Sequence, residues 1–223
     1  PQHRRIEGDR LGCSRARQEK GASASEAEAS DGYGQNVTVR KGEVETIEYN
    51  RDKSLTVTVY LGKQKGYAST ADFAPRAIRD TVEAALTIAR FTAADDCAGL
   101  ADPEELATEP RDLDLFHPWD LAVERAIEIA KRCEAAAFRL DKRIANSEGA
   151  SVSCQQVHFA LGNSHGFMQG YPTSRHSLSC AVIAAENGQM QRDDWYVSQR
   201  APQDLADPES VGDYAGRRAL ARL

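Results

Sequence analysis

The sequence predicts an α+β fold, with helices packed on one face of antiparallel sheets and two successive α/β subdomains. Residues 55–61 alternate apolar and polar side chains with the period of a strand. The Asn187-Gly188 pair tolerates positive φ at both positions and therefore predicts a hairpin in the second half. In each half, strand-like segments precede a helix that starts at a proline, which is typical of helices layered on antiparallel sheet.

The composition excludes several classes of protein. The 223 residues suffice for one large or two small domains, and the net charge is -6 with no basic cluster, so we expect no direct nucleic-acid binding. No apolar run approaches the ~20 residues that cross a bilayer, so we expect no membrane partner. Five scattered cysteines without a CxxC pair predict free thiols in a reducing compartment, and we expect a cytoplasmic protein.

The first residues of the N-terminal half show no pattern of a helix or strand. Residues 1–22 carry few apolar side chains and no helical stripe, so we expect them to be disordered or aberrant. An N-terminal α+β domain is predicted at 23–92. Within it, Gly32-Tyr33-Gly34 predicts a turn, Gly42 interrupts an apolar alternation and predicts a β-bulge, and the polar residues 50–53 predict a second turn.

A helix and a linker follow. Pro75 suits the first position of a helix whose apolar stripe ends near Phe91. Residues 93–118 are rich in proline and acidic side chains, which predicts a linker pinned to a domain surface by a few apolar residues. A long amphipathic helix is then expected over 119–140.

The second half returns to strands. Strands are predicted around 157–161 and 178–182, with a turn over 162–166 between them. Asp207 is predicted to cap a final helix that begins at Pro208. We expect residues 119–223 to form a central α+β domain, truncated before a further C-terminal domain.

No complete catalytic motif accompanies these elements. His158, His165 and His176 with Cys154 and Cys180 offer metal-ligating atoms, but they lack zinc-site spacing, which favours turn and surface histidines. The glutamates of residues 43–48 are interpreted as a solvated sheet face. A nucleophile elbow, a phosphate-binding glycine loop and the HExxH motif are all absent from the sequence.

Three long segments resemble one family. They are VTVRKGEVETIEYNRDKSLTVTVYLGKQKGYAST at 37–70, DLDLFHP at 112–118 and NSHGFMQGYPTSRHSLSCAVIAAENGQMQRD at 163–193. These segments are similar to the TldD/PmbA family of metallopeptidases, and specifically to its PmbA (TldE) branch. The resemblance covers about residues 26–223.

The resemblance implies an intracellular complex in which a TldD-like subunit pairs with a PmbA-like one. The TldD-like subunit carries a divalent metal, expected to be zinc, on a His-Glu-x-x-x-His helix, so no cofactor is expected in this chain. Such a complex trims unfolded peptides, including antibiotic-peptide precursors and antitoxins. The family's metal ligands lie in a C-terminal half that this sequence does not reach, which implies a non-catalytic part of the complex.

Five residues are the candidate contacts for a peptide or a partner subunit: Asn163, His165, Tyr171, Arg175 and His176. Hairpin packing and turn geometry are an equally good interpretation of these side chains. Two other functions stay open, a self-sufficient hydrolase that uses the His, Cys and Glu groups above, and a non-enzymatic adaptor such as a DNA gyrase modulator.

Overall fold

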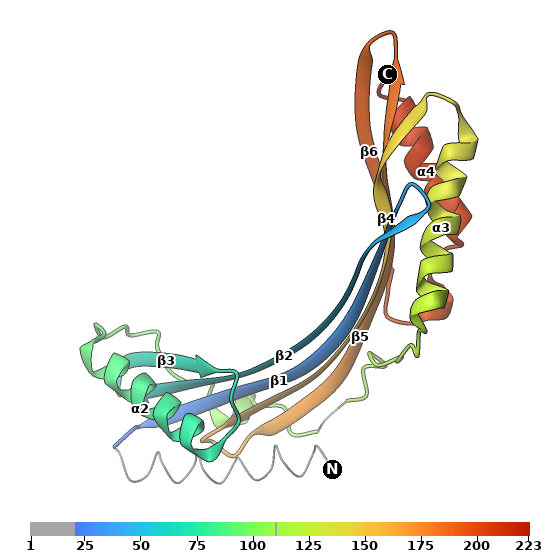
Figure 1. Ribbon diagram of the computed structural model, residues 1–223. Coiled ribbons are helices and arrows are strands. Elements are labelled where there is room, and N and C mark those ends of the chain that lie inside the picture. Colours follow the sequence, from blue (N-terminus) through green and yellow to red (C-terminus); the bar gives the residue numbers. More distant parts are fainter. Residues whose placement is uncertain (1–20, 110) are drawn as a thin grey trace. The chain divides into compact units, whose positions relative to one another are not determined.

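The structure is a computed structural model that describes residues 21–109 and 111–223, so the expectation for residues 1–20 lies outside the described part. Its elements follow one another along the chain as strands and helices (Figure 1). They are β1 (Ala24–Arg40), β2 (Glu43–Leu61), β3 (Gln64–Thr70), α2 (Pro75–Phe91), the 3-10 turn η1 (Pro103–Glu105), α3 (Val123–Leu140), β4 (Ile144–Asn163), β5 (Met168–Glu186), β6 (Gln189–Gln199), η2 (Pro202–Asp204) and α4 (Pro208–Leu220).

The described strands form one six-stranded sheet in the order β3-β2-β1-β4-β5-β6. β3 pairs antiparallel with β2, and β6 pairs antiparallel with β5. The α+β class with antiparallel strands is therefore confirmed. The pairing of β1 with β4 joins segments that lie more than a hundred residues apart in the sequence, and the local pattern of the sequence does not predict it.

The chain divides into two compact units. Of the described residues, the first unit contains 21–32, Asp52–Leu113 and Val157–Pro172, and the second contains Tyr33–Arg51, Asp114–Gln156 and Thr173–Leu223. Each long strand contributes one stretch to each unit. The predicted domains at 23–92 and 119–223, with a linker over 93–118, stay a prediction about the sequence.

The core of the first unit lies between α2 and the sheet. The C-terminal part of β2 supplies Leu55, Val57 and Val59, which are all buried. The apolar stripe of α2 covers them. Gly66 on β3 lets the helix approach closely, because a Cβ there would lie 2.2 Å from the carbonyl oxygen of Ala85. The predicted start of α2 at Pro75 and its end at Phe91 are both confirmed.

The core of the second unit lies beneath α3 and α4, which pack against each other in Figure 1. Val37 and Val39 of β1 have no exposed surface and belong to this core. α3 begins at Val123, four residues after the predicted start at Trp119, and ends at Leu140 as expected. Trp119 instead packs against the core from the preceding segment.

Two predicted turns and one predicted bulge are wrong. Lys41 (φ 52°) and Gly42 (φ 77°) form the two-residue turn between β1 and β2, a type I′ geometry, rather than a bulge. Residues 50–53 lie inside β2, and residues 32–34 lie inside β1. A Cβ at Gly34 would lie 2.0 Å from the side-chain oxygen of Gln155, so that flexible side chain would have to move.

The structure confirms the predicted turn of the second hairpin and the predicted start of the last helix. Asn187 (φ 52°) and Gly188 (φ 79°) form the predicted turn between β5 and β6. Asp207 stands at the N-cap of α4, but its side chain makes no capping hydrogen bond. Its carboxylate instead lies 3.4 Å from Nη2 of Arg132.

Candidate functional site

The first residues of β5 form an open strand edge. β6 pairs with β5 only from His176 to Glu186, so within the described part of the chain no strand pairs with Met168–Pro172 on the side away from β4. Backbone N–H and C=O groups on such an edge are ready to pair with another extended chain. This edge is therefore the first element of the candidate site.

The direction of these backbone groups follows from Ser174. Its N–H donates to the carbonyl oxygen of Leu115 at 2.9 Å, on the side away from β4. Since successive residues of a strand point to alternate sides, Gly170 and Pro172 present their backbone groups on the same side. Pro172 has no N–H to leave unpaired, which suits an edge position. The groups offered are both polar groups of Gly170 and the carbonyl of Pro172.

Gly170 is fixed by the strand behind it. A Cβ at this position would lie 2.4 Å from the carbonyl oxygen of Phe159 on β4 and 3.1 Å from Cα of Ala160. Any larger residue would push β4 and β5 apart. The close contact leaves no room for a side chain at position 170, so the exposed Gly170 has no side chain of its own over its backbone.

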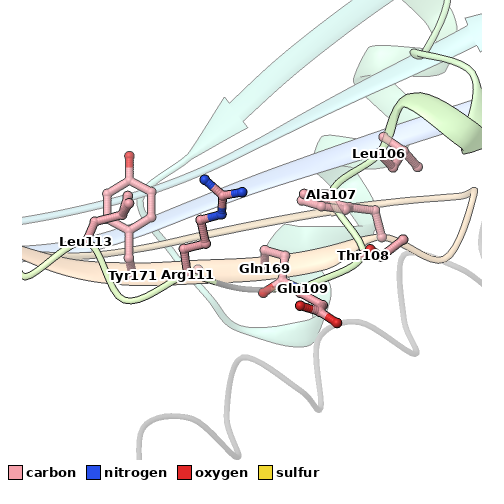
Figure 2. Close-up of a pocket in the computed structure, with 10 residues that line it drawn as sticks. Leu106, Ala107, Thr108, Glu109, Arg111, Leu113, Gln169 and Tyr171 are labelled. Atoms are coloured by element: carbon pink, nitrogen blue, oxygen red, sulfur yellow. The ribbon is translucent and has the colours of Figure 1, made fainter.

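A pocket of about 560 Å³ adjoins this edge, within the first unit (Figure 2). Its lining residues come from the segment before α3 and from the start of β5. They are Leu106, Ala107, Thr108, Glu109, Arg111, Leu113, Phe167, Gln169, Gly170 and Tyr171. The volume falls in the range of pockets that hold small ligands or a few side chains.

The pocket combines an apolar wall with two opposite charges. Leu113 is exposed, Tyr171 is 45% exposed, and the Tyr171 ring packs against Phe159 with a centroid distance of 5.5 Å. Figure 2 shows Arg111 and Tyr171 as neighbouring sticks, while Glu109 points elsewhere. A guanidinium binds carboxylates through paired N–H donors, and a carboxylate binds amines. The pocket thus suits a peptide side chain or terminus of either charge.

The structure places Asn163 and His165 at the turn before β5. The Asn163 side-chain oxygen accepts hydrogen bonds from the N–H groups of His165 at 3.0 Å and Phe167 at 3.2 Å, so it shapes this turn. Nδ1 of His165 lies 3.1 Å from the carbonyl oxygen of Ala101. Both residues belong to the same unit as Tyr171, the only one of the five predicted contacts that lines the pocket.

Arg175 and His176 belong to the second unit. Nη1 of the exposed Arg175 donates to the Ser198 hydroxyl at 3.2 Å, across the β5–β6 pair. His176 has no exposed surface, and its Nε2 lies 2.9 Å from the carbonyl oxygen of His117 while Trp119 packs edge-on against it. His176 is therefore a core residue without a surface for direct contact. The contact role of the five residues stays a prediction.

The side chains examined as metal ligands are spread over the fold. Within residues 21–109 and 111–223, no three His, Cys, Asp or Glu side chains gather in a geometry that holds a metal ion. Cys133, Cys154 and Cys180 are buried free thiols, and Cys97 is an exposed one, whereas Cys13 lies outside the described residues. The described residues therefore do not fit a metal centre.

Arg111, Glu109 and Gln169 were missed at the sequence level. The first two lie in a segment interpreted as a linker, where charged residues are expected to be solvated. Leu106 and Leu113, which lie on either side of Glu109 and Arg111, were the available signal, because apolar residues in a polar segment mark a place where it packs.

None of the described helices is long and apolar enough to span a membrane.

Two family models match the chain. The PmbA/TldA metallopeptidase domain 1 matches residues 25–89, and the PmbA/TldA metallopeptidase central domain matches residues 116–223. The chain is 50% identical over 202 residues to Metalloprotease PmbA of Escherichia coli O157:H7, which covers 91% of this chain and 45% of that protein. It is 40% identical over 204 residues to a Metalloprotease PmbA homolog of Haemophilus influenzae, covering 92% and 45%.

Solved structures share the fold. A protein of Bacteroides thetaiotaomicron, described as a candidate modulator of DNA gyrase, superposes with a TM-score of 0.87 at 20% identity, over 97% of this chain and 50% of that one. TldE from Thermococcus kodakarensis gives a TM-score of 0.73 at 16% identity, over 97% and 47%. The present chain spans about half the length of the proteins that it matches.

Proposed function

The chain belongs to the PmbA/TldD family, and we propose that it is the peptide-holding part of a PmbA/TldE-like subunit in a cytoplasmic metalloprotease complex. In this proposal a TldD-like partner carries the divalent metal, expected to be zinc, and performs the cleavage. The substrates are unfolded peptides, including peptide precursors that are matured and antitoxins that are degraded. The present subunit binds and orients them.

The open edge of β5 is the observation that supports this proposal most. An extended peptide that adds a strand to a sheet edge is held through its backbone, whatever its sequence. Gly170 and Pro172 provide the free backbone groups for such a strand, and Gly170 has no side chain in the way. Recognition of this kind suits a complex that accepts many unfolded peptides.

The adjoining pocket adds a weaker side-chain preference. Alternate side chains of an added strand point to the same face, so every second residue of the peptide meets the pocket wall. Tyr171 offers an aromatic surface, and Arg111 and Glu109 offer one charge of each sign. A bound peptide is then oriented by its charged residue or terminus, while the backbone pairing supplies the common part of the affinity.

No chemical step is assigned to this chain, because its described residues gather no metal-ligand cluster. The partner's metal would supply a Lewis acid and an activated water for peptide hydrolysis. The residues of this chain would keep the peptide extended and in register. That division of labour predicts that pocket variants change peptide binding without changing the metal content of the complex.

The experiment uses the full-length protein as its organism makes it, mixed with a TldD-like protein of the same genome. Size exclusion separates the species, and each peak is assayed for metal and for cleavage of an unfolded peptide. We expect a joint peak that holds the metal and all the activity. The double variant Arg111→Ala, Tyr171→Ala should elute identically and keep the metal, but its KM for the peptide should rise.

The controls separate the site from general damage. Tyr171→Phe keeps the ring that packs on Phe159 and should retain the parental KM. Arg139→Ala removes a charge from the last turn of α3, in the other unit, and should do the same. Metal and cleavage in this protein alone would contradict the proposal in favour of a self-sufficient hydrolase. Target binding without any peptidase partner would contradict it in favour of an adaptor such as a gyrase modulator.

A further inference from the structure

Arg111 is a cation without a partner in the pocket beside β5. It is the one basic side chain among the described residues that line this pocket, and it is exposed. Within the described part of the chain, Arg111 makes neither a hydrogen bond nor an ion pair. Figure 2 shows its guanidinium and the Glu109 carboxylate directed to opposite sides. The N–H donors of Arg111 are therefore available to a ligand.

The wall beside Arg111 is apolar. Tyr171 is its neighbour in Figure 2, and three further apolar side chains line the pocket: Leu106, Leu113 and Phe167. Apolar surroundings lower the local dielectric constant, which strengthens the attraction between opposite charges. A guanidinium binds a carboxylate through two parallel N–H donors. A carboxylate is therefore the group that this part of the pocket binds best.

The pleat of an added strand decides which peptide side chain reaches Arg111. In antiparallel addition, one peptide residue exchanges both hydrogen bonds with Gly170. The preceding peptide residue then lies opposite Tyr171, and opposite residues of paired strands project to the same face. Gln169 and Tyr171 share that face, and both line the pocket. The peptide side chain opposite Tyr171 therefore points into the pocket beside Arg111.

We propose that Arg111 makes the open edge of β5 selective for peptides with an aspartate or glutamate opposite Tyr171. This inference rests on the proposed function, because it requires strand addition at Met168–Pro172. The carboxylate of a peptide C-terminus fits less well, since it lies in line with the strand backbone and not on the face of Tyr171. A lysine or arginine opposite Tyr171 is repelled by Arg111.

Acidic side chains of the same segment restrict the site to one carboxylate. Glu104 and Glu105 precede the pocket residues in the sequence, and Glu109 lines the pocket. A peptide with a run of acidic residues brings further carboxylates toward these three, and like charges repel one another over about 8 Å at physiological salt. The substrate class is therefore an extended peptide with an isolated acidic residue.

The test measures the binding of labelled peptides with an amidated C-terminus to the full-length protein by fluorescence anisotropy. The peptides are identical stretches of threonine and serine that carry Glu, Gln or Lys at one central position. The Glu peptide should bind about fivefold more tightly than the Gln peptide, as expected for one exposed ion pair, and the Lys peptide should bind most weakly. Arg111→Glu should reverse this order.

The matched control is Arg79→Glu. Arg79 is an exposed residue of α2 in the same unit, and it does not line the pocket. This variant carries the same change of charge, so it should keep the parental order of the three peptides. An order that Arg111→Glu leaves unchanged, or that Arg79→Glu reverses as well, would contradict the assignment to Arg111.

Backbone methylation links the ion pair to the register. The amide of the acidic residue points away from β5, whereas the amide of the next residue donates to the carbonyl oxygen of Gly170. An N-methyl group on the glutamate of the Glu peptide should therefore leave its affinity unchanged. An N-methyl group on the next residue should lower the affinity about fivefold, because one backbone hydrogen bond is lost.

The outcomes separate this inference from the proposed function. If the Glu and Gln peptides bind equally while methylation still acts in one phase, the selectivity is wrong and strand addition stands. If no peptide binds, or if both methylated peptides bind alike, both the selectivity and the proposed function are wrong. A Gln peptide with a free C-terminus that matches the amidated Glu peptide would overturn the choice of a side-chain carboxylate.

Discussion

Glu134 on α3 binds the backbone of Gly42, whose N–H donates to Oε2 at 2.8 Å. The second carboxylate oxygen accepts from the neighbouring N–H of Lys41, also at 2.8 Å. Glu134 is only 1% exposed, so both of these bonds are made away from water. A buried carboxylate is costly unless it is fully hydrogen-bonded, and here the turn between β1 and β2 provides the donors.

Glu134→Gln should lower the free energy of unfolding by about 2 kcal/mol, because an amide has one acceptor oxygen and its NH₂ group would face a backbone N–H. Urea denaturation measures the change. Glu124→Gln, on the exposed surface of the same helix, should shift the free energy of unfolding by less than about 0.5 kcal/mol. Equal losses in the two variants would contradict the role of Glu134.

Gly212→Ala should be among the most damaging single substitutions in α4. A Cβ at Gly212 would lie 1.8 Å from the carbonyl oxygen of Cys133 and 3.2 Å from Cβ of Ala136 on α3. The helices would have to separate, at a cost of about 3 kcal/mol. Thermal unfolding measures this loss.

The matched control for that substitution is Gly99→Ala. Gly99 has no atom within 4 Å of its added Cβ and no positive φ. The Tm of this variant should stay near that of the parent. A Gly212→Ala protein with the parental Tm would show that α3 and α4 pack less closely than described.

The ion pair of Arg132 and Glu209 should make stability depend on pH. Nε and Nη2 of Arg132 each lie 2.7 Å from a carboxylate oxygen of Glu209. The hydrogen bonds from Arg132 lower the pKa of Glu209 from 4.5 to about 2. The folded chain then binds a proton less readily than the unfolded chain, so the pair stabilises above about pH 4.5 and loses this effect as the pH falls toward about 2.

Glu209→Gln tests this dependence. Glu209 is 35% exposed and solvent screens the pair, so the loss at neutral pH should be at most about 1 kcal/mol. The difference in unfolding free energy between parent and variant should vanish only below about pH 2, and added salt should reduce it at neutral pH. A difference that grows on acidification would have the wrong sign for this account.

Thiol reactivity should follow burial. The hydrogen bond with Cys180 and burial hold the pKa of the Cys133 thiol above its usual range, and burial raises the pKa of Cys154. Since the thiolate is the reactive form, a Cys13→Ser protein should show rapid reaction of Cys97 with a disulfide reagent and slow reaction of the three buried thiols until it is unfolded. Rapid reaction at Cys133 in the folded protein would contradict this.

The sequence predicts best those elements in which burial alternates. Residues 55–61 face a core on one side, and α2 carries a clear apolar stripe. Asn187 and Gly188 both adopt the positive φ that their residue types favour, which forms the turn. Residues 43–52 are exposed on both faces, so their sequence has no alternation of apolar and polar side chains that would predict a strand. The polar stretch over 50–53 therefore looked like a turn, although pairing with β1 makes it strand.

The candidate site was only partly predictable. Tyr171 stands in a segment whose strand pattern and unusual polar residues were visible in the sequence. Arg111 and Glu109 come from a segment without secondary structure, and only the tertiary fold brings them beside β5. The open edge itself depends on where β6 ends, which no local signal specifies.

The most direct test of the central claim is the binding of a labelled unfolded peptide to the full-length protein, followed by fluorescence anisotropy. Two versions of the peptide carry N-methyl groups on alternate amides, one residue out of phase with each other. Pairing with the β5 edge predicts that one phase loses about tenfold in affinity, because each lost backbone hydrogen bond costs about 1 kcal/mol, while the other phase binds like the parent peptide. Equal binding of both phases would contradict strand addition at β5.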